Sequence, residues 1–359
     1  MKEIEREILI IGAGPAGLSA AIEAARAGAN VTVADENATV GGQLYKQIHK
    51  FFGSAENDAG ARGFEIARKL ESEARALGVE FWLNTVAYGL FKEGVGIVKD
   101  QANFIVKAKK IIVAAGGIEN TTAFPGSTLP GVMLAGASQM LANVHRVLPG
   151  KRILVIGSGN VGLIVAYQML QAGAQVLAVI EKSDRIGGYG VHAEKLRSAG
   201  VPICTNTVVR SVSGSTSVET VTTVSANGHE TVYDADTVIM AVGMSPMTEL
   251  LWNAGCRFEY IHELGGHVPL HSEYMETTVA GLYAAGDVTG VEEASIAMEE
   301  GRLAGIAAAS ACGRMTQQER DALCAKHIAS LQELESGEYD EGRGTARAKK
   351  LELFNALKQ

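Results

Sequence analysis

A glycine-rich pattern that occurs twice constrains the fold of this chain more than any other feature. The first copy, Gly12–Gly17, follows a short apolar run and opens a small-residue helix expected over 18–27. The second copy, Gly157–Gly162, stands between a similar apolar run and a second such helix. Gly14 and Gly159 lie 145 residues apart, so the repeat covers a whole domain rather than a short motif.

The residues of the first glycine turn each have a physical role in binding a dinucleotide. Gly12 permits a sharp turn, Gly14 lets the backbone approach a pyrophosphate, and Gly17 lets the helix pack on its strand. The start of the helix, at Pro15 and Ala16, offers N–H groups and partial positive charge to phosphates. We therefore expect all five residues to contact a dinucleotide.

The ligand of the first turn is expected to be FAD. Asp35 or Glu36, at the end of the next strand, can accept hydrogen bonds from an adenosine ribose. FAD is long and needs a second anchor for its ribityl and flavin end, and an acid at a strand end provides one in Gly286-Asp287. A helix that begins near Ala294 can direct its amino terminus at the flavin N1–O2 region, where positive potential stabilises the anionic reduced flavin.

The second glycine turn predicts a second nucleotide site by the same reasoning. Its acid is Glu181, whose carboxylate can hydrogen-bond a free ribose 2′-hydroxyl and repels a 2′-phosphate. Lys182 and Arg185 stand close enough to weaken this preference, so NAD(H) is favoured over NADP(H), and a degenerate or differently occupied site stays open. The expected cofactor contacts are Gly157, Gly159, Asn160, Val161, Gly162 and Glu181.

The simplest assembly of these segments nests one domain inside the other. Two further strands that end in small residues, at 110–117 and 237–243, close the two sections. The predicted fold class is α/β, with two nested Rossmann-like dinucleotide-binding domains. The expected bounds are residues 1–118 and 246–315 for a discontinuous FAD-binding domain and residues 119–245 for an NAD(P)-binding-like domain.

The carboxy-terminal residues, 316–359, differ in composition from the rest. From Thr316 onward they are charged and helix-favouring, and Gly342-Arg343-Gly344 interrupts the pattern. Charged helices of this kind usually face solvent. The helical tail is therefore either a solvated helix pair or a docking surface, and we favour the solvated pair.

Charge and composition argue against several classes of partner. The 359 residues carry a formal net charge of −8 at pH 7 without a long Lys/Arg run, which argues against nucleic acid. No apolar stretch is suited to span a bilayer, and the amino terminus runs into a strand without a signal peptide, so a cytoplasmic location is expected. The cysteines have neither metal-ligand nor Cys-x-x-Cys spacing, and no metal site is predicted. They are Cys204, Cys256, Cys312 and Cys324.

Six motifs occur together along the chain: Gly12–Gly17, Gly41–Gln43, Ala114–Gly117, Gly157–Gly162, Ala241–Gly243 and Ala284–Asp287. In combination they resemble the two-dinucleotide-binding-domain flavoproteins of the thioredoxin reductase and glutathione reductase type, over about 310 residues. The resemblance implies that Val86, on a strand over 79–86, contacts the adenine through its backbone. It also implies that Gly42 and Gln43 line the route to the flavin. Further expected contacts are Ala115, Gly116 and Gly243.

The redox cysteines of that type are absent from this chain. Residues 131–138 lie where thioredoxin reductases carry their cysteine pair, and residues 41–44 lie where the glutathione reductase type carries its own. Neither segment contains cysteine. Without a thiolate to attack the flavin or receive from it, a dithiol relay cannot operate. The flavin itself would perform the redox step, and no catalytic residue is predicted.

Four segments carry a closer likeness: Asp35-Glu36, Gly41–Gln47, Ile186–His192 and Gly290–Ala294. They are similar to the α subunit of multi-subunit amino-acid and amine dehydrogenases, a group that includes hydrogen cyanide synthase, opine oxidase and D-hydroxyproline dehydrogenase and is related to heterotetrameric sarcosine oxidase. The likeness implies an electron-transferring subunit, a β flavoprotein partner that oxidises the C–N bond of a small amine or amino acid, and a small iron–sulfur protein. Because this chain lacks the cysteines for a cluster, any cluster must come from another polypeptide.

Two other functions stay open. One is a stand-alone NAD(P)H-dependent flavin reductase without a redox disulfide, and the other is a nucleotide-binding assembly subunit without catalysis of its own. His192 is either a cofactor or substrate contact or an ordinary residue of the fold, and we favour the second reading. Lys46 and His49 either approach the flavin or a partner, or lie in solvent, which we take as the default.

Overall fold

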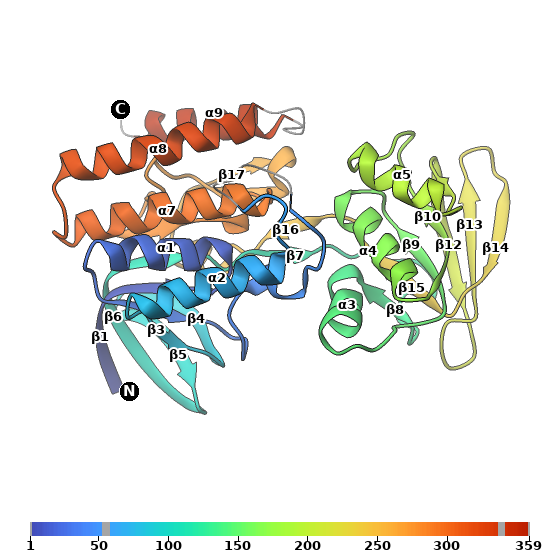
Figure 1. The fold of residues 1–359 in the computed structure, drawn as a ribbon, viewed down its shortest axis with the longest axis horizontal. Helices are drawn as coiled ribbons and strands as arrows, with labels where there is room; N and C mark the ends of the chain where they lie inside the picture. Colours follow the sequence, from blue (N-terminus) through green and yellow to red (C-terminus); the bar gives the residue numbers. More distant parts are fainter. Residues whose placement is uncertain (1, 52–57, 337–341, 358–359) are drawn as a thin grey trace. The chain divides into compact units, whose positions relative to one another are not determined.

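The chain folds into two compact units. In the computed structural model, which describes residues 2–51, 58–336 and 342–357, the first unit comprises residues 1–118 and 245–359, and the second comprises residues 119–244. The second unit is therefore inserted into the sequence of the first. Both units contain a parallel sheet flanked by helices, so the predicted α/β class is confirmed (Figure 1).

The sheet of the first unit has the strand order β3-β2-β1-β6-β5-β4, with β19 also paired to β6. Strands β1, β2, β3, β6 and β19 run parallel, whereas β4, β5 and β6 form an antiparallel meander at one edge. Parallel strands covered on both faces are built from continuous apolar runs. The bounds are β1 Lys2–Ile11, β2 Val31–Ala34, β3 Glu80–Trp82, β4 Thr85–Phe91, β5 Gly94–Lys99, β6 Ala102–Val113 and β19 Leu282–Ala284.

The single strand predicted over 79–86 is wrong. Strand β3 ends at Trp82 and β4 begins at Thr85, because Asn84 takes the left-handed conformation with a φ of +50° and turns the chain. Asn is one of the few non-glycine residues that adopt this conformation readily. The N–H of Thr85 then donates to the carbonyl of Asp35 over 2.8 Å, which places the start of β4 beside the end of β2.

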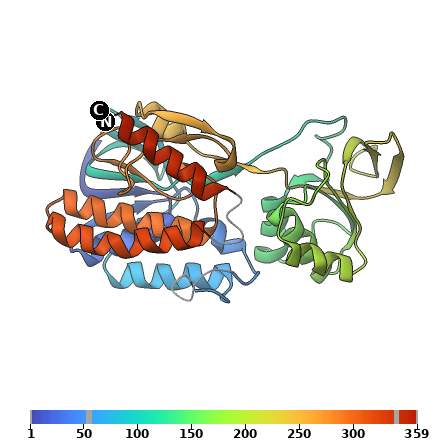
Figure 2. The ribbon, with the colours of Figure 1, turned by 90° about the horizontal axis from the view of Figure 1, so that it is seen from above.

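Helices α1, α2 and α7 lie together on one face of this sheet (Figures 1 and 2). Helices α1 and α7 pack unusually closely, because a Cβ at Gly301 or Gly305 would collide with the carbonyl oxygen of Ala16 or Ala20. The helix predicted over 18–27 begins earlier than expected, since proline suits the first helical position. The bounds are α1 Pro15–Arg26, α2 Gly63–Ala76 and α7 Ala294–Ala311.

The carboxy-terminal helices α8, Gln317–Glu335, and α9, Arg343–Ala356, are not the solvated pair that we favoured. Helix α8 begins with a capping box at Thr316 and packs along α7, where it buries Cys324 and Leu331. Helix α9 buries a face that includes two cations. Both helices therefore belong to the core of the first unit.

The second unit has a parallel sheet with the strand order β11-β10-β9-β15-β8 and a separate antiparallel sheet, β12-β13-β14. Helix α4 connects β9 to β10 and packs against α5. The strand bounds are β8 Val132–Leu134, β9 Arg152–Ile156, β10 Gln175–Ile180, β11 Ile203–Cys204, β12 Thr207–Ser213, β13 Thr220–Ser225, β14 Glu230–Asp234 and β15 Thr237–Met240. The helices are α3 Ala135–Gln139, the π-helical turn η3 Met140–Val144, α4 Asn160–Gln171 and α5 Gly190–Ser198.

Short elements complete the chain. The two segments that connect the units pair with each other as β7 and β16. Among the helices that the structure describes, none combines the length and the apolar character needed to cross a bilayer. The bounds are β7 Gly117–Glu119, β16 Met244–Pro246, α6 Glu249–Asn253, β17 Phe258–Ile261, β18 Gly266–Pro269, and the 3₁₀ turns η1 Gly42–Lys46, η4 His262–Leu264 and η5 Asp287–Thr289.

Candidate dinucleotide-binding sites

The first glycine turn lies at the carboxyl end of β1, between that strand, β6 and α1. A Cβ at Gly12 would collide with the carbonyl oxygen of Ala114, and Gly12 has a φ of +106°. A Cβ at Gly17 would collide with the carbonyl oxygen of Gly12. Only glycine fits at these two positions, so the turn is as tight as the pattern predicted.

The amino terminus of α1 is bordered by backbone rather than by side chains. Pro15 is the first helical residue, and the N–H groups that open a helix have no partner within it. The glycine pair that precedes η1 lies directly against this terminus: the N–H of Gly41 donates to the carbonyl of Ala13 over 2.8 Å, and a Cβ at Gly42 would come within 2.8 Å of the Gly14 Cα. A cradle of this kind, made of glycine backbone and helix N–H groups, fits a pyrophosphate.

Asp35 and Glu36 differ in what they are free to bind. The Asp35 carboxylate is buried and braces the glycine turn, accepting the N–H of Ala13 over 2.6 Å and the N–H of Asn37 over 2.8 Å. The Glu36 side chain is exposed. Val86 lies at the start of β4, beside this strand end, with its side chain 44% exposed.

Gly286 and Asp287 follow β19 and reach the first turn of α1. A Cβ at Gly286 would lie 2.8 Å from the Cβ of Ala16, and Gly286 has a φ of +80°. The structure thus brings together the two motifs from which an extended ligand was predicted, although they come from opposite ends of the chain. Helix α7 begins at Ala294, as expected.

The carboxyl group of Asp287 has a strongly perturbed acidity. Burial, together with the nearby carboxylates of Glu300, Glu292 and Glu293, raises its pKa to about 7, although it accepts a hydrogen bond from the Glu292 backbone. A carboxyl group near half-protonation at neutral pH can either accept a hydrogen bond from a hydroxyl or donate one.

The second glycine turn repeats the first. The Glu181 carboxylate accepts the Ser158 N–H over 2.9 Å, the Ser158 hydroxyl over 2.7 Å and the Ser183 N–H over 2.8 Å. Partial burial raises the pKa of Glu181, but these hydrogen bonds outweigh burial and lower it. Glu181 therefore stays ionised, and it braces Ser158 as Asp35 braces Ala13.

A second loop over each turn was missed in the second copy. The Gly188 N–H donates to the Ser158 carbonyl over 2.8 Å, and the Tyr189 N–H donates to the Asn160 Oδ1 over 2.8 Å. This repeats the contact between Gly41 and Ala13. A glycine pair begins six residues after each bracing acid, at Gly41 and at Gly187, and this spacing could have revealed the loop.

The remaining predicted residues lie as follows. Gly116 follows β6, and its carbonyl accepts the Met247 N–H over 3.0 Å. Gly243 follows β15, and its carbonyl accepts the Asn120 N–H over 2.9 Å. His192 is buried on α5 near Tyr189, and burial, with Lys195 nearby, lowers its pKa. Also placed beside the turns are Ala115, Gly157, Gly159, Val161 and Gly162, while Gln43 is exposed and Lys46 and His49 are partly buried.

The four cysteines are free. Cys324 is fully buried, and burial raises its pKa to about 12, which makes a thiolate unfavourable at neutral pH. Residues 131–138, where a redox pair was considered, form β8 and the start of α3. Among the described residues, no group of three or more His, Cys, Asp or Glu side chains is placed to hold a metal ion.

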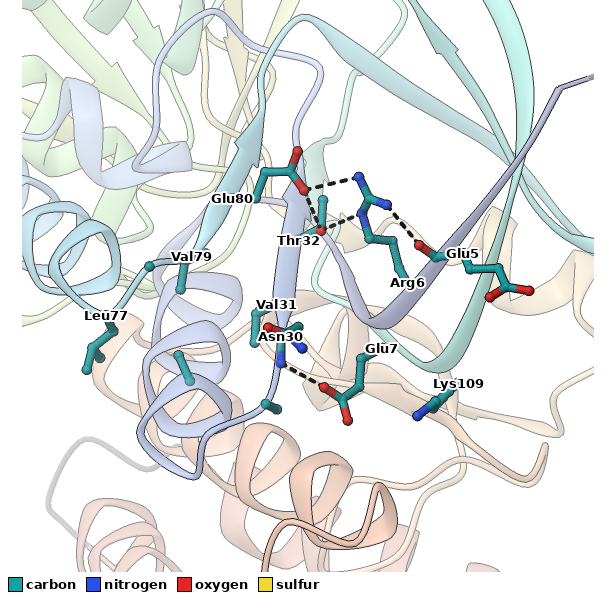
Figure 3. Close-up of a pocket in the computed structure, with 13 residues that line it drawn as sticks. Glu5, Arg6, Glu7, Asn30, Val31, Thr32, Leu77, Val79, Glu80 and Lys109 are labelled. Carbon is teal, nitrogen blue, oxygen red and sulfur yellow. Dashed lines mark hydrogen bonds and ion pairs between the residues drawn. The ribbon is translucent and has the colours of Figure 1, made fainter.

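A separate cavity of about 540 Å³ lies at the amino ends of β1, β2 and β3 (Figure 3). Glu7 in this cavity accepts the Asn30 N–H over 2.8 Å and pairs with Arg314 over 2.6 Å. Arg6 donates to Thr32 over 3.0 Å and pairs with Glu80 over 3.2 Å. Parallel α/β sheets bind ligands at the carboxyl ends of their strands. The cavity is therefore distinct from both glycine turns.

Residues 6–301 match the family model described as "Pyridine nucleotide-disulphide oxidoreductase". The chain belongs to this family. It is 29% identical over 329 residues to one of the opine oxidase subunits of Agrobacterium tumefaciens (strain Ach5), covering 84% of this chain and 65% of that protein. It is 26% identical over 329 residues to the alpha subunit of sarcosine oxidase from Corynebacterium sp. (strain P-1), covering 86% of this chain and 33% of that protein.

The fold is that of thioredoxin reductase. The T. acidophilum enzyme superposes with a TM-score of 0.71 at 23% identity, over 85% of this chain and 98% of that chain. The family member is thus an FAD-dependent oxidoreductase, and its predicted likeness to opine oxidase and sarcosine oxidase subunits is confirmed. It spans less than two thirds of the length of those two relatives.

Proposed function

We propose that this chain is the electron-transferring α subunit of a multi-subunit amino-acid or amine dehydrogenase. The single observation that carries the flavin assignment is the contact between Gly286 and the first turn of α1, at Ala16. It makes one continuous surface from the glycine turn to the Asp287 carboxyl group. The relatives named as oxidase subunits support the assignment to a complex.

Different parts of this surface would hold different parts of FAD. The N–H groups at the start of α1, with Gly14 and Gly42, would bind the pyrophosphate. The exposed Glu36, supported by the buried Asp35, would accept hydrogen bonds from the adenosine ribose, and the backbone of Val86 would lie at the adenine.

The far end of the site is formed by β19 and α7. The Asp287 carboxyl group would bind a ribityl hydroxyl. The amino terminus of α7, at Ala294, would place partial positive charge at the pyrimidine side of the flavin. Bound FAD supplies two-electron redox chemistry, and the protein supplies binding, orientation and this electrostatic field.

The electrons would leave this subunit for another protein rather than for a disulfide. Residues 41–44 and 131–138 contain no cysteine, so no dithiol can relay electrons beside the flavin. The proposed partners are a β flavoprotein that oxidises the C–N bond and a small iron–sulfur protein. The small amine or amino-acid substrate would bind to the partner.

We propose NAD(H) as the ligand of the second turn. The ionised Glu181 favours a ribose with a free 2′-hydroxyl and opposes a 2′-phosphate. The intact second turn also supports a second candidate function, a stand-alone NAD(P)H-dependent flavin reductase. In that case electrons would enter through the second turn and leave to a small acceptor.

Anaerobic reduction of the purified chain separates these functions. For the α subunit we expect a yellow chain whose flavin absorbance persists with NADH, and activity on D-hydroxyproline or an opine only with its partner subunits. Bleaching by NADH within turnover time would instead establish the reductase. A colourless chain that binds adenine nucleotide tightly would identify an assembly subunit.

The flavin site itself is tested by Asp287→Ala. We expect this variant to lose FAD affinity by about tenfold or more, because a hydrogen bond to a charged group is lost. Glu263→Ala, at an exposed acid on the same unit, is the matched control. Equal flavin content in the two purified variants would count against Asp287 as the ribityl ligand.

A further inference from the structure

Helix α9 buries two cations on one face. Lys350 is fully buried and Arg347 is 5% exposed, and their spacing of three residues places them on the same side of the helix. The apolar residues that α9 buries are Ala346 and Phe354. Burying an ammonium or guanidinium group is costly unless it is paired and hydrogen-bonded. The contacts of these cations should therefore show what α9 does.

Lys350 contacts the segment that follows β19. Its Nζ donates a hydrogen bond over 2.7 Å to the carbonyl oxygen of Thr289, the last residue of η5. Asp287 is the first residue of the same 3₁₀ turn. A buried charge on the carboxy-terminal helix is thus used to hold the backbone two residues from the proposed ribityl ligand.

Arg347 reaches the same segment through Glu300 of α7. The guanidinium of Arg347 pairs with Glu300 and with Glu335, and it lies 3.9 Å from Glu292. Glu300 in turn accepts the Gly286 N–H over 2.7 Å and the Thr289 hydroxyl over 3.0 Å. One carboxylate therefore ties both ends of Gly286–Thr289, and Arg347 compensates its buried charge.

We propose that α9 is a clamp that positions the segment Gly286–Thr289 for the flavin, with Lys350 and Arg347 as its positioning residues. The proposal rests on the proposed function, in which Asp287 binds the ribityl chain. The clamp acts on the site through the backbone of the segment and through Glu300. It assigns the carboxy-terminal helix a role in holding the cofactor, rather than only in covering α7.

The test uses the full-length chain and three methionine variants. Lys350→Met keeps most of the side-chain volume but leaves the Thr289 carbonyl without its donor, and Arg347→Met leaves Glu300 uncompensated. Lys349→Met, at an exposed neighbour on the same helix, is the matched control. FAD dissociation constants are measured by fluorescence titration of the apoprotein, and amide exchange is followed by mass spectrometry over 286–290 and over β1.

We expect Lys350→Met and Arg347→Met each to weaken FAD binding by about tenfold, as loss of a buried charge-assisted hydrogen bond implies. Exchange should rise over 286–290 and stay unchanged over β1, which separates local repositioning from general destabilisation. Lys349→Met should match the wild type. Arg347→Lys should recover part of the lost affinity because it restores the charge beside Glu300.

The outcomes separate this proposal from the proposed function. If Asp287→Ala loses FAD while Lys350→Met and Arg347→Met bind it as the wild type does, the clamp is overturned and the flavin site stands. If Asp287→Ala binds FAD normally, the ribityl assignment falls and the flavin-positioning role of α9 falls with it. Should Lys350→Met fail to fold, Arg347→Lys is compared by exchange alone, and wild-type exchange over 286–290 overturns the clamp.

Discussion

Gly286 lies directly against Ala16, so that a Cβ on Gly286 would stand only 2.8 Å from the Ala16 Cβ. This contact joins the segment after β19 to the first turn of α1. Gly286 also has a φ of +80°, in the left-handed region. Both constraints exclude a larger residue.

Gly286→Ala should therefore destabilise the apoprotein by about 2–4 kcal/mol, the sum of a left-handed backbone and a steric overlap. Gly313→Ala is the matched control, because Gly313 has a φ of +79° but open space around its Cα. The control should cost about 1 kcal/mol, the backbone term alone. Urea unfolding of both apoproteins measures the difference, and equal midpoints would contradict the steric contact.

Glu181→Ala should change the choice of nicotinamide dinucleotide. Removal of the carboxylate abolishes its repulsion of a 2′-phosphate and frees Ser158, so the NADH-to-NADPH affinity ratio should fall by about tenfold. FAD content should be unaffected, since Glu181 belongs to the other unit. Glu194→Ala, at an exposed acid on α5, serves as the control. An unchanged affinity ratio would remove Glu181 from the nucleotide site.

The raised pKa of Asp287 predicts a pH-dependent stability. In the folded apoprotein the pKa of this group is about 7, and in the unfolded chain its pKa is near the ordinary value of 3.8. Between these values the folded state holds the proton and the unfolded state does not. The contribution of Asp287 to stability therefore falls as pH rises from about 4 to about 7 and is flat outside that window.

Asp287→Asn removes this titration. Across the window, the stability of the wild type relative to Asp287→Asn should fall by about 3 kcal/mol. Denaturant unfolding of both apoproteins at several pH values measures it, with Glu263→Gln as the control for loss of one exposed charge. Parallel pH profiles for the wild type and Asp287→Asn would show that the carboxyl group is not perturbed.

A chain without cysteine should keep its redox activity. The variant carries Ser at Cys204 and Cys312, which are partly buried, and Ala at the buried Cys256 and Cys324. Because no thiol takes part in the proposed electron path, turnover with partner subunits should stay within about twofold of the wild type. A loss of several orders of magnitude, with FAD still bound, would mean that a cysteine relays electrons.

The glycine turns could be predicted because their requirements are local. At Gly12 the neighbouring strand leaves no room for a side chain, and at Asp35 and Glu181 the bracing contact follows from a fixed distance along the chain. The start of α7 at Ala294 was also predictable, since the change from turn to helix composition is local. Where a local residue chose between two backbone conformations, prediction failed, as at Asn84.

Sequence alone determined that this chain contains two α/β nucleotide-binding turns and no dithiol, because glycine spacing and the absence of cysteine pairs are properties of the chain itself. Only the tertiary structure decided the place of α9. Arg347 and Lys350 belong to a charged pattern that is typical of a solvated helix, but their partners, Glu300 and the Thr289 carbonyl, come from distant segments. A buried charge is stable only when such partners are assembled around it, and folding alone brings them there.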